Sequence, residues 1–596
     1  MSPIVETKRI ACSAPPSALW PLLADTERLN REAGLAPMEV EALPTSELPA
    51  RYKVKSRFGP LEVEWLEHPF EWQEERRFSV HRAFTKGPIQ HLDFGLELTP
   101  EGSGTVVIAR FEILPNVAML TPVLRVALDA FAHKIEDAVR RFDRQLKEPN
   151  PTLSPKVDGP ALKRAQQEAE RSLGPGLQPP LEALIEHLER APDHEVARIR
   201  PFALADRLNV PRRPFLEACL GATVAGLLEL RFEVVCPSCR TASSQLTDLA
   251  QLEANGHCHL CDLSFGLELD RSVEASFRPA APIRAVPDIA FCTGGPAVMP
   301  HVVAQRVLHP GDTAELLAPA AVGRYRLQAR GGAQAAVELV DGGPAEQTIE
   351  VEDDRLLPAN FTLAPGGTLR LVAKASARHV KLEHLLWSSA AATLHEVTTI
   401  GTFRRLFSKG LLRPGMGLKV GRVALLFSDL SASTALYARE GDAAAFDLVQ
   451  AHFDLLKASI EGHDGAVVKT IGDAVMAAFI DERSAVRAAV AMQKAFPGFR
   501  AGHPASAEVF LKVGVYAGPC YAVSANGILD YFGQSVNVAA RLQGQAEAAE
   551  LVLPAELAAS LGAEGLFLGL TVSEPFQAEL KGVAGSISLV RVGFLR

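Results

Sequence analysis

The length of the chain constrains its fold more than any other feature. At 596 residues it exceeds what a single hydrophobic core supports, because domains usually contain about 100–200 residues. We therefore expect about three to five folded units. Hydrophobic residues make up 47% of the chain and charged residues 22%, as in globular domains rather than disordered or fibrous chains. The net charge of −9 argues against a general affinity for nucleic acid.

No segment is apolar enough to predict a membrane span. The best candidate, Leu216 to Cys236, is interrupted by charged residues, whereas a spanning helix needs about 20 mostly apolar residues. The first residues, MSPIVETKRIACSAPP, lack the apolar region and cleavage site of a secretory signal. Half of the eight cysteines are isolated, which does not fit a disulfide framework. We therefore expect a cytoplasmic protein.

Residues 1–147 show the pattern of a sheet that packs against a long helix. A short strand is followed by a helix that begins at Pro15 and Pro16, because proline is favoured in the first turn of a helix. Residues 92–98 and 107–113 alternate apolar and polar side chains, with the period of half-buried strands. We expect a long helix from about Pro122 to Lys147. An early helix, an antiparallel meander and a long last helix form a helix-grip fold.

Within this unit, the stretch APPSALWPLLADTERLN resembles the START-like, or polyketide-cyclase-like, ligand-binding superfamily. The resemblance implies an apolar cavity between the sheet and the last helix, a site suited to a hydrophobic small molecule. The alternative is that large side chains simply fill this core, and the candidates are Trp65, Trp72, Phe78 and Phe84. A sequence does not give the volume of a cavity, so both interpretations stay open.

A Pro- and Gly-rich stretch, residues 148–181, predicts a linker with one short helix. Residues 182–235 then predict helix, turn, helix and strand, an order that resembles a winged-helix unit. In a DNA-binding unit of this kind, the second helix carries Arg, Asn or Gln toward base edges. Here that helix is PFLEACLGATVAGLL, which offers almost no such side chain. We therefore expect it to pack against protein, and we expect no nucleic-acid partner.

Two Cys-x-x-Cys pairs follow in residues 236–270. Cys236 and Cys239 are separated from Cys258 and Cys261 by eighteen residues. Four thiolates at this spacing match the tetrahedral coordination that Zn²⁺ prefers, with Zn–S distances of about 2.3 Å. Because sulfur fills all four positions, no coordination site is left for a substrate. The sequence therefore predicts a zinc ribbon with a structural Zn²⁺ ion.

Residues 271–390 contain short apolar runs separated by HPGD, DGGP and APGGT, a spacing typical of a small β-sandwich. A spacer, a partner surface and a second sensor are all compatible with them. In residues 391–420, apolar side chains recur at three- and four-residue steps and predict an amphipathic coupling helix. They are Leu394, Val397, Ile400, Phe403 and Phe407. Such a helix could pack against its twin in a dimer or against its own chain.

Two aspartates in residues 421–596 stand at places where side chains are commonly exposed, one at the end of a predicted strand and one in a predicted turn. The apolar run Val423 to Phe427 predicts a buried strand, and Asp429 follows at its end. In AVVKTIGDAVMAAF, two β-rich arms flank Gly472-Asp473, which predicts a hairpin turn. Either carboxylate alone is commonplace, so the prediction depends on their combination.

A third segment, LDYFGQSVNVAARLQ, places Asp530 before a helix on which Asn537 and Arg541 are four residues apart and share one face. Taken together, the three segments resemble the catalytic domain of class III adenylate and guanylate cyclases over residues 420–596, and in particular the bacterial type. The resemblance implies a ferredoxin-like α/β fold at the C-terminal end of a multidomain α+β protein.

The resemblance also implies a role for each residue. Asp429 and Asp473 would bind two Mg²⁺ or Mn²⁺ ions, for which carboxylate oxygens are suitable ligands. Such ions activate the ribose 3′-hydroxyl and hold the triphosphate. Asn537 would position the ribose, and Arg541 would neutralise charge on the phosphoryl oxygens in the transition state. Lys581 matches a lysine that contacts the terminal phosphates.

Lys469 and Asp530 match the pair that recognises adenine, one as a donor to a ring nitrogen and the other as an acceptor from the exocyclic amine. Guanine-selective relatives carry Glu and Cys at these places. By the family's architecture, the carboxylates and this pair lie on opposite faces of a dimer interface, so we expect a homodimer with two equivalent sites. One loop departs from the family pattern, because Ala432 and Ser433 replace a Gly and a Phe next to the phosphates.

The sequence therefore predicts an adenylate cyclase, a phosphorus–oxygen lyase that converts ATP to 3′,5′-cyclic AMP and pyrophosphate under the control of N-terminal sensor modules. Two alternatives stay open. One is a guanylate cyclase that uses GTP. The other is a ligand-sensing regulator whose cyclase-like domain is inactive and serves for dimerisation, against which the complete metal-binding and transition-state set argues.

Overall fold

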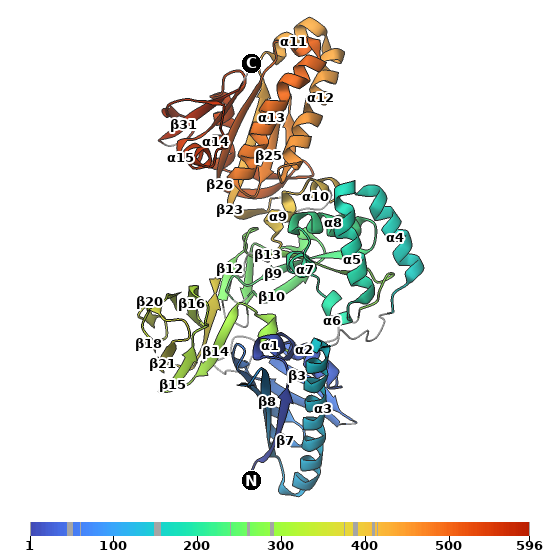
Figure 1. Cartoon of the computed structure of the whole chain (residues 1–596), viewed down its shortest axis with the longest axis vertical. Helices are drawn as coiled ribbons and strands as arrows, with labels where there is room; N and C mark the ends of the chain where they lie inside the picture. The colour runs from blue at the N-terminus through green and yellow to red at the C-terminus, as the bar shows by residue number, and fades with distance from the viewer. Residues whose placement is uncertain are drawn as a thin grey trace.

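The computed structural model describes the chain except residues 1, 44–51, 60, 148–155, 239, 259–262, 287–290, 375, 386–390, 408–411, 414, 584 and 595–596. Figure 1 shows an elongated molecule with the N-terminal unit, in blue, at one end and the C-terminal unit, in orange and red, at the other. A helical unit and a sheet-rich unit lie between them. None of the described helices combines the length and the low charge that a membrane crossing requires.

The N-terminal unit is an antiparallel sheet against which one long helix packs. The long helix expected from the sequence is α3, which contacts β1 and β8. The early helix is interrupted at Asp25, whose side chain accepts a hydrogen bond from the backbone N–H of Arg28 and caps a second helix. The elements are β1 (Ile4–Cys12), α1 (Pro16–Ala24), α2 (Thr26–Glu32), β2 (Glu39–Ala42), β3 (Tyr52–Phe58), β4 (Leu61–Glu67), β5 (Glu71–Gln73), β6 (Arg77–Lys86), β7 (Ile89–Glu101), β8 (Gly104–Pro115) and α3 (Thr121–Lys147).

Large side chains of this sheet share one buried cluster with side chains of α3. Trp72 and Phe78 are buried there together with Phe142 of α3. Trp65 is buried in a smaller cluster, against which Phe84 packs. Aromatic side chains thus contribute to the core as the second interpretation predicted, while the START-like resemblance and a ligand in this unit stay predictions.

The helical unit buries the helix that we compared with a recognition helix. Helix α8 packs against α4, α5, α7 and β9, and its residues Phe215, Leu216 and Cys219 are at most 1% exposed. Its apolar face therefore belongs to the protein core. The elements are α4 (Gly159–Ser172), α5 (Gln178–Arg190), α6 (Asp193–Val196), α7 (Pro201–Leu208), α8 (Arg212–Val224), β9 (Leu228–Val235), β10 (Ala242–Leu246), β11 (Asn255–Cys258), β12 (Leu263–Gly266) and β13 (Val273–Pro279).

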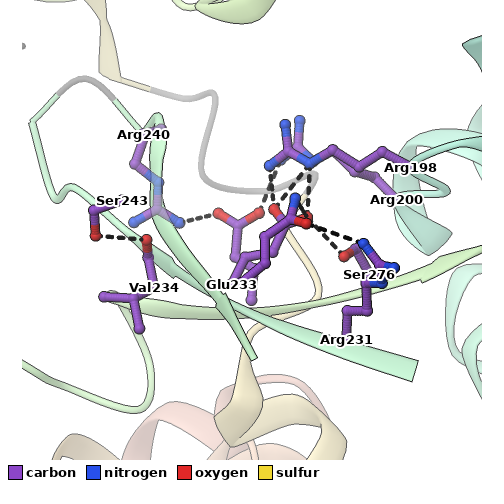
Figure 2. A network of polar contacts seen from close by, with 10 residues as sticks. Arg198, Arg200, Arg231, Glu233, Val234, Arg240, Ser243 and Ser276 are labelled. Atoms are coloured by element: carbon purple, nitrogen blue, oxygen red, sulfur yellow. Dashed lines mark hydrogen bonds and ion pairs between the residues drawn. The ribbon is translucent and has the colours of Figure 1, made fainter. Parts of the chain in front are cut away.

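A buried network of charges joins this unit to its sheet (Figure 2). Glu233 of β9 is 1% exposed and accepts hydrogen bonds from Arg198 Nε at 2.8 Å and from Ser276 Oγ at 2.7 Å. Glu274 of β13 is 3% exposed and pairs with Arg200 and Arg240. Buried charges persist only when they are paired, so these contacts hold β9, β13 and the start of α7 in one arrangement.

The β-sandwich has two sheets, but its borders differ from the expected ones. Strand β14 pairs with both β22 and β5, so one sheet of the sandwich continues the sheet of the N-terminal unit into 13 strands. Strand β13, expected within the sandwich, pairs with β9 instead. The elements are β14 (Val302–Leu308), β15 (Thr313–Leu317), β16 (Gly323–Ala329), β17 (Gln334–Leu339), β18 (Glu346–Val351), β19 (Leu356–Leu357), β20 (Asn360–Leu363), β21 (Thr368–Ala373) and β22 (Arg378–His384).

The prediction of one continuous coupling helix was wrong. The segment forms two short helices, α9 (Leu394–Thr398) and α10 (Gly401–Leu406). The hydroxyls of Thr398 and Thr399 donate hydrogen bonds to the carbonyls of residues 395 and 396, and side-chain bonds of this kind compete with the helical ladder. Leu394, Val397, Ile400 and Phe403 are at most 1% exposed. The segment therefore packs against its own chain.

The C-terminal unit is a nine-stranded sheet in the order β24-β25-β23-β26-β28-β31-β29, with β27 paired to β26 and β30 to β31. Helices α12 and α13 cover one face, and α14 packs on the other. The elements are β23 (Gly417–Leu430), α11 (Ser433–Glu440), α12 (Asp442–Glu461), β24 (Gly465–Ile471), β25 (Ala474–Phe479), α13 (Glu482–Gly502), β26 (Leu511–Ala525), β27 (Ile528–Phe532), α14 (Gln534–Gly544), β28 (Glu550–Pro554), α15 (Ala555–Ala563), β29 (Thr571–Val572), β30 (Phe576–Glu579) and β31 (Ser586–Gly593).

Candidate active site

The two predicted metal-binding carboxylates converge at one end of the sheet. Asp429 is near the end of the central strand β23, and Asp473 occupies the turn between β24 and β25. The register that opposes Ser428 to Val475 places the two carboxylates side by side. Burial and the neighbouring charge of Asp473 raise the pKa of Asp429. Oδ2 of Asp473 is buried and has no hydrogen-bond partner within the described part of the chain. Such a pair suits a divalent cation.

Two further side chains reach Asp429, and the sequence analysis missed both. Gln543 Nε2 donates a hydrogen bond to Asp429 Oδ2 at 3.2 Å. Lys512 is opposite Asp429 in the register of β23 and β26, and its positive charge acts to lower the pKa of Asp429. Gln543 is two positions beyond Arg541 and therefore does not share the helix face of Asn537 and Arg541. Lys512 is identified only by the register of the strands.

The structure also brings together Lys469 and Asp530, which are on β24 and β27. Lys469 Nζ lies 2.5 Å from Asp530 Oδ2. The other carboxylate oxygen of Asp530 accepts the backbone N–H of Tyr531 at 2.8 Å. The Lys469 side chain is 30% exposed and that of Asp530 is 12% exposed. One donor and one acceptor therefore meet at a site that solvent can reach from the lysine side.

Asn537 and Arg541 are exposed on α14, and Lys581 is exposed in the turn after β30. Among the described side chains, none of the three forms a hydrogen bond or ion pair with the two carboxylates or with the Lys469–Asp530 pair. The structure thus assembles two parts of the predicted set, and the other three residues stand apart from both.

Glycine in β26 allows α14 to approach the sheet. A Cβ at Gly514 would lie 2.3 Å from the backbone nitrogen of Gln543, a distance at which something must shift. Ser535, in the first turn of α14, donates a hydrogen bond to the carbonyl of Pro519 at 2.7 Å. Together with the apolar packing of Val538 and Leu542, these two contacts hold Asn537 and Arg541 in place relative to the sheet.

The loop that departs from the family pattern has an unusual backbone conformation. Ala432, just before α11, has φ 60° and ψ 20°. This left-handed region favours glycine and costs other residues about 1 kcal/mol. The glycine of the common pattern would adopt it freely, so the substitution adds backbone strain next to Asp429.

Three large apolar side chains are exposed near the Lys469–Asp530 pair. Ile471, at the end of β24, is 52% exposed, Tyr521 is 50% exposed and Phe532 is 70% exposed. Tyr521 and Phe532 oppose each other in the register of β26 and β27. Large apolar side chains grouped beside a polar site are typical of a surface that another protein covers.

Comparisons with known proteins match two parts of the chain. Residues 418–586 match the family model of the adenylate and guanylate cyclase catalytic domain. Residues 173–290, which include most of the helical unit, match a family of unknown function, DUF5939. The chain therefore carries a class III adenylate and guanylate cyclase catalytic domain at its C-terminal end.

Individual relatives each match a part of the chain. Human retinal guanylyl cyclase 1 is 29% identical over 176 residues, which are 27% of this chain and 15% of that protein. The uncharacterized protein Rv2212 of Mycobacterium tuberculosis is 39% identical over 132 residues, 22% of this chain and 32% of that protein. The chain thus spans less than a third of the length of these curated relatives. The crystal structure of the adenylyl cyclase CyaB from P. aeruginosa is 21% identical, with a TM-score of 0.27, and the match covers 30% of this chain and 97% of that one.

Proposed function

We propose that the protein is an adenylate cyclase that converts ATP to 3′,5′-cyclic AMP and pyrophosphate. The Lys469–Asp530 pair carries the proposal. Without substrate, the ammonium and the carboxylate neutralise each other at 2.5 Å. An adenine ring would replace this contact, because its ring nitrogen accepts from Lys469 and its exocyclic amine donates to Asp530. A guanine ring has a carbonyl where adenine has the amine, and this carbonyl would face a second acceptor.

The carboxylates support the use of Mg²⁺ or Mn²⁺. Asp429 and Asp473 would hold the ions, and their mutual repulsion and the unpartnered Oδ2 of Asp473 fit a divalent cation better than an empty site. Bound cations of this kind lower the pKa of the 3′-hydroxyl and neutralise the triphosphate. Gln543 holds Asp429 through one oxygen and leaves its other oxygen available as a ligand.

The remaining residues act on the sugar and the phosphates. In the reaction, the ribose 3′-oxygen bonds to the α-phosphorus, the bond from that phosphorus to the bridging oxygen breaks, and pyrophosphate leaves. Asn537 would orient the ribose so that the 3′-oxygen is in line with the leaving group. Arg541 would neutralise the charge that develops on the phosphoryl oxygens, and Lys581 would contact the terminal phosphates.

A homodimer is part of the proposal. Asn537 and Arg541 are exposed and do not contact the carboxylates of their own chain, and apolar side chains at Ile471, Tyr521 and Phe532 surround the base-recognition pair. These features support two copies that meet face to face, so that each copy supplies carboxylates to one site and Arg541 to the other.

The guanylate cyclase alternative is supported by the name of one relative, retinal guanylyl cyclase 1. Turnover of ATP and GTP by the purified full chain with Mn²⁺ separates the two functions. We expect ATP to be preferred by about ten- to a thousandfold, because each buried polar group left unpaired costs about 1–3 kcal/mol. Equal turnover of ATP and GTP would instead support the guanylate cyclase alternative. A chain that is inert with both nucleotides would support the inactive regulator instead.

We also propose that Cys236, Cys239, Cys258 and Cys261 hold a structural Zn²⁺. Cys236 and Cys258 are buried in one apolar cluster, and Cys236 Sγ accepts the backbone N–H of Ser238 at 3.4 Å, a bond that favours a thiolate. Cys239 and Cys261 lie outside the described residues. Elemental analysis of the full chain should find one zinc per chain, and Cys236→Ser should lose it. A zinc-free, folded wild-type chain would contradict this proposal.

The N-terminal unit would act as a sensor of a hydrophobic small molecule that sets the rate of the cyclase. The helix-grip order of elements supports this role. Native mass spectrometry of freshly purified chain should show a retained ligand together with the dimer. A chain without added mass that also takes up no lipid-like probe would exclude the ligand.

A further inference from the structure

The coupling segment contacts the strand that carries Asp530. Arg404 of α10 donates one hydrogen bond to the carbonyl of Leu529 at 2.8 Å and another to the carbonyl of Thr398 at 2.6 Å. Its guanidinium lies over the ring of Tyr531, 5.5 Å from the centroid. The hydroxyls of Thr398 and Tyr531 are 3.3 Å apart. Both chain neighbours of Asp530 are therefore held from the coupling segment.

These contacts matter because β27 is short and has one strand partner. The strand has five residues and pairs only with β26 within the described sheet. Its other side faces a cavity of about 420 Å³ between α10, α12 and β24, lined in part by Arg404 and Leu529. Leu529 and Tyr531 are buried in the apolar cluster of this region, at 2% and 3% exposure. The hydrogen bonds and the ring contact of Arg404 add direction to this packing, because they fix the carbonyl of Leu529 and the ring of Tyr531 on either side of Asp530.

We propose that Arg404 is a positioning residue for base recognition, which holds Leu529 and Tyr531 so that Asp530 meets Lys469 and an incoming adenine in the correct orientation. This inference rests on the proposed cyclase function and extends it, because Arg404 is outside residues 418–586 that match the catalytic family. Base specificity then depends on a segment that the catalytic domain does not contain.

The helical unit also holds the same segment. Arg213 of α8 donates a hydrogen bond to the carbonyl of Thr399 at 2.6 Å and forms an ion pair with Asp464 of the catalytic domain at 3.0 Å. Glu217 of α8 accepts a hydrogen bond from the hydroxyl of Thr402. A shift of α8 would therefore move Thr399 and Thr402, which precede Arg404 in the chain, and this gives the helical unit a route to the base pocket.

The test compares Arg404→Ala with Arg405→Ala in the full chain. Arg405 is the matched control, since it is the next residue in α10 and pairs with Glu461 at 2.9 Å instead of contacting β27. Binding of 3′-deoxy-ATP and 3′-deoxy-GTP with Mn²⁺ is measured by calorimetry, because these analogues lack the attacking hydroxyl. The KM and kcat for ATP are measured alongside.

We expect Arg404→Ala to weaken 3′-deoxy-ATP binding about tenfold or more, since a hydrogen-bonded charged group is lost, and to lower the preference for adenine over guanine by a similar factor. KM should rise while kcat changes less than about twofold. Arg404→Lys should recover part of the loss, because lysine retains one donor but not the planar contact with Tyr531. Thr398→Val, which removes only one hydroxyl, should shift binding in the same direction by a smaller factor.

An unchanged adenine preference in Arg404→Ala and Thr398→Val would overturn the inference. So would an equal loss in Arg405→Ala, since that result would indicate a general effect of α10. If Arg404→Ala fails to fold, the adenine preference of Arg404→Lys and Thr398→Val decides whether the inference holds. If the wild-type chain binds the adenine analogue and the Arg404 variants weaken that binding, but no cyclic nucleotide forms, the result would overturn the proposed function and leave the role of Arg404 in place.

Discussion

The two parts of the candidate site within one chain are held in different ways. Asp429 is on β23, in the middle of the sheet, where β25 and β26 flank it on both sides. Lys469 and Asp530 are on β24, at the edge of the sheet, and on the five-residue β27, which the coupling segment supports from outside the catalytic domain. The side of the site proposed for the metal ions is therefore held within the domain, and the side proposed for the base is open to influence from the rest of the chain.

The largest effect should come from the metal side. Asp429→Asn or Asp473→Asn should reduce cyclic nucleotide formation by about three orders of magnitude or more, because the charge that neutralises the cations is lost. Asp447→Asn is the matched control, since Asp447 is exposed on α12 of the same domain. The measurement is the initial rate with saturating Mn²⁺ and ATP. Near-normal rates in either site variant would show that the carboxylates do not hold the catalytic cations.

A second prediction concerns the helix that carries Arg541. Gly514→Ala should destabilise the catalytic domain by about 1–3 kcal/mol and displace α14, because the new Cβ meets backbone that cannot move aside. Gly544→Ala, near the end of the same helix, meets nothing within 4 Å and should be nearly neutral. Thermal unfolding of the two variants measures the difference, and equal melting temperatures would disprove the close approach.

A third prediction tests the coupling segment through pH. Burial raises the pKa of Glu396 from 4.5 to about 7, although the neighbouring Arg213 and Arg212 act to lower it. Between these two values the folded chain holds a proton that the unfolded chain has released, so stability falls as pH rises from 4.5 to 7 and stays reduced above 7.

Glu396→Gln should remove this loss and raise the free energy of unfolding above pH 7 by about 1–3 kcal/mol. Melting temperatures from pH 5 to 8 provide the measurement. Glu253→Gln, at an exposed position, should leave the pH profile of the wild type unchanged. Parallel profiles of melting temperature against pH in the wild type and in Glu396→Gln would contradict the raised pKa of Glu396.

The smallest effect should come from the loop between β23 and α11 that contains Ala432. Ala432→Gly relieves a left-handed backbone conformation and should gain about 1 kcal/mol or less, because glycine also loses more entropy on folding. Nucleotide affinity should rise or stay equal. Ala435→Gly, in the following helix α11, should instead lose stability. A loss of stability in Ala432→Gly of the same size as in Ala435→Gly would show that the loop is not strained.

Local patterns predicted the parts of the fold and site that depend on neighbouring residues. The long helix α3, the hairpin turn at Asp473 and the face shared by Asn537 and Arg541 follow from short-range periodicity and turn chemistry. The coupling segment shows the limit of the same reasoning. Its apolar spacing was helical, but threonine hydroxyls at 398 and 399 divided it in two.

Long-range pairing decided what local patterns could not predict. The union of β5 with β14 joins two units that the sequence separated, and the pairing of β13 with β9 moved a boundary. Gln543 and Lys512 reach Asp429 through helix docking and strand register. Arg404 and Leu529 are 125 positions apart, and no spacing rule relates residues at that separation.

The amino-acid sequence by itself determined which chemical groups are present: the carboxylates of Asp429 and Asp473, the Lys469–Asp530 pair proposed for the base, and Arg541, proposed for the phosphates. Local spacing was enough to place Asp429 near a strand end, Asp473 in a turn and Arg541 on one helix face with Asn537. Only the tertiary structure decided what supports them. Support comes from packing and hydrogen bonds between distant segments, and the energies of those contacts depend on a three-dimensional arrangement that no local pattern contains.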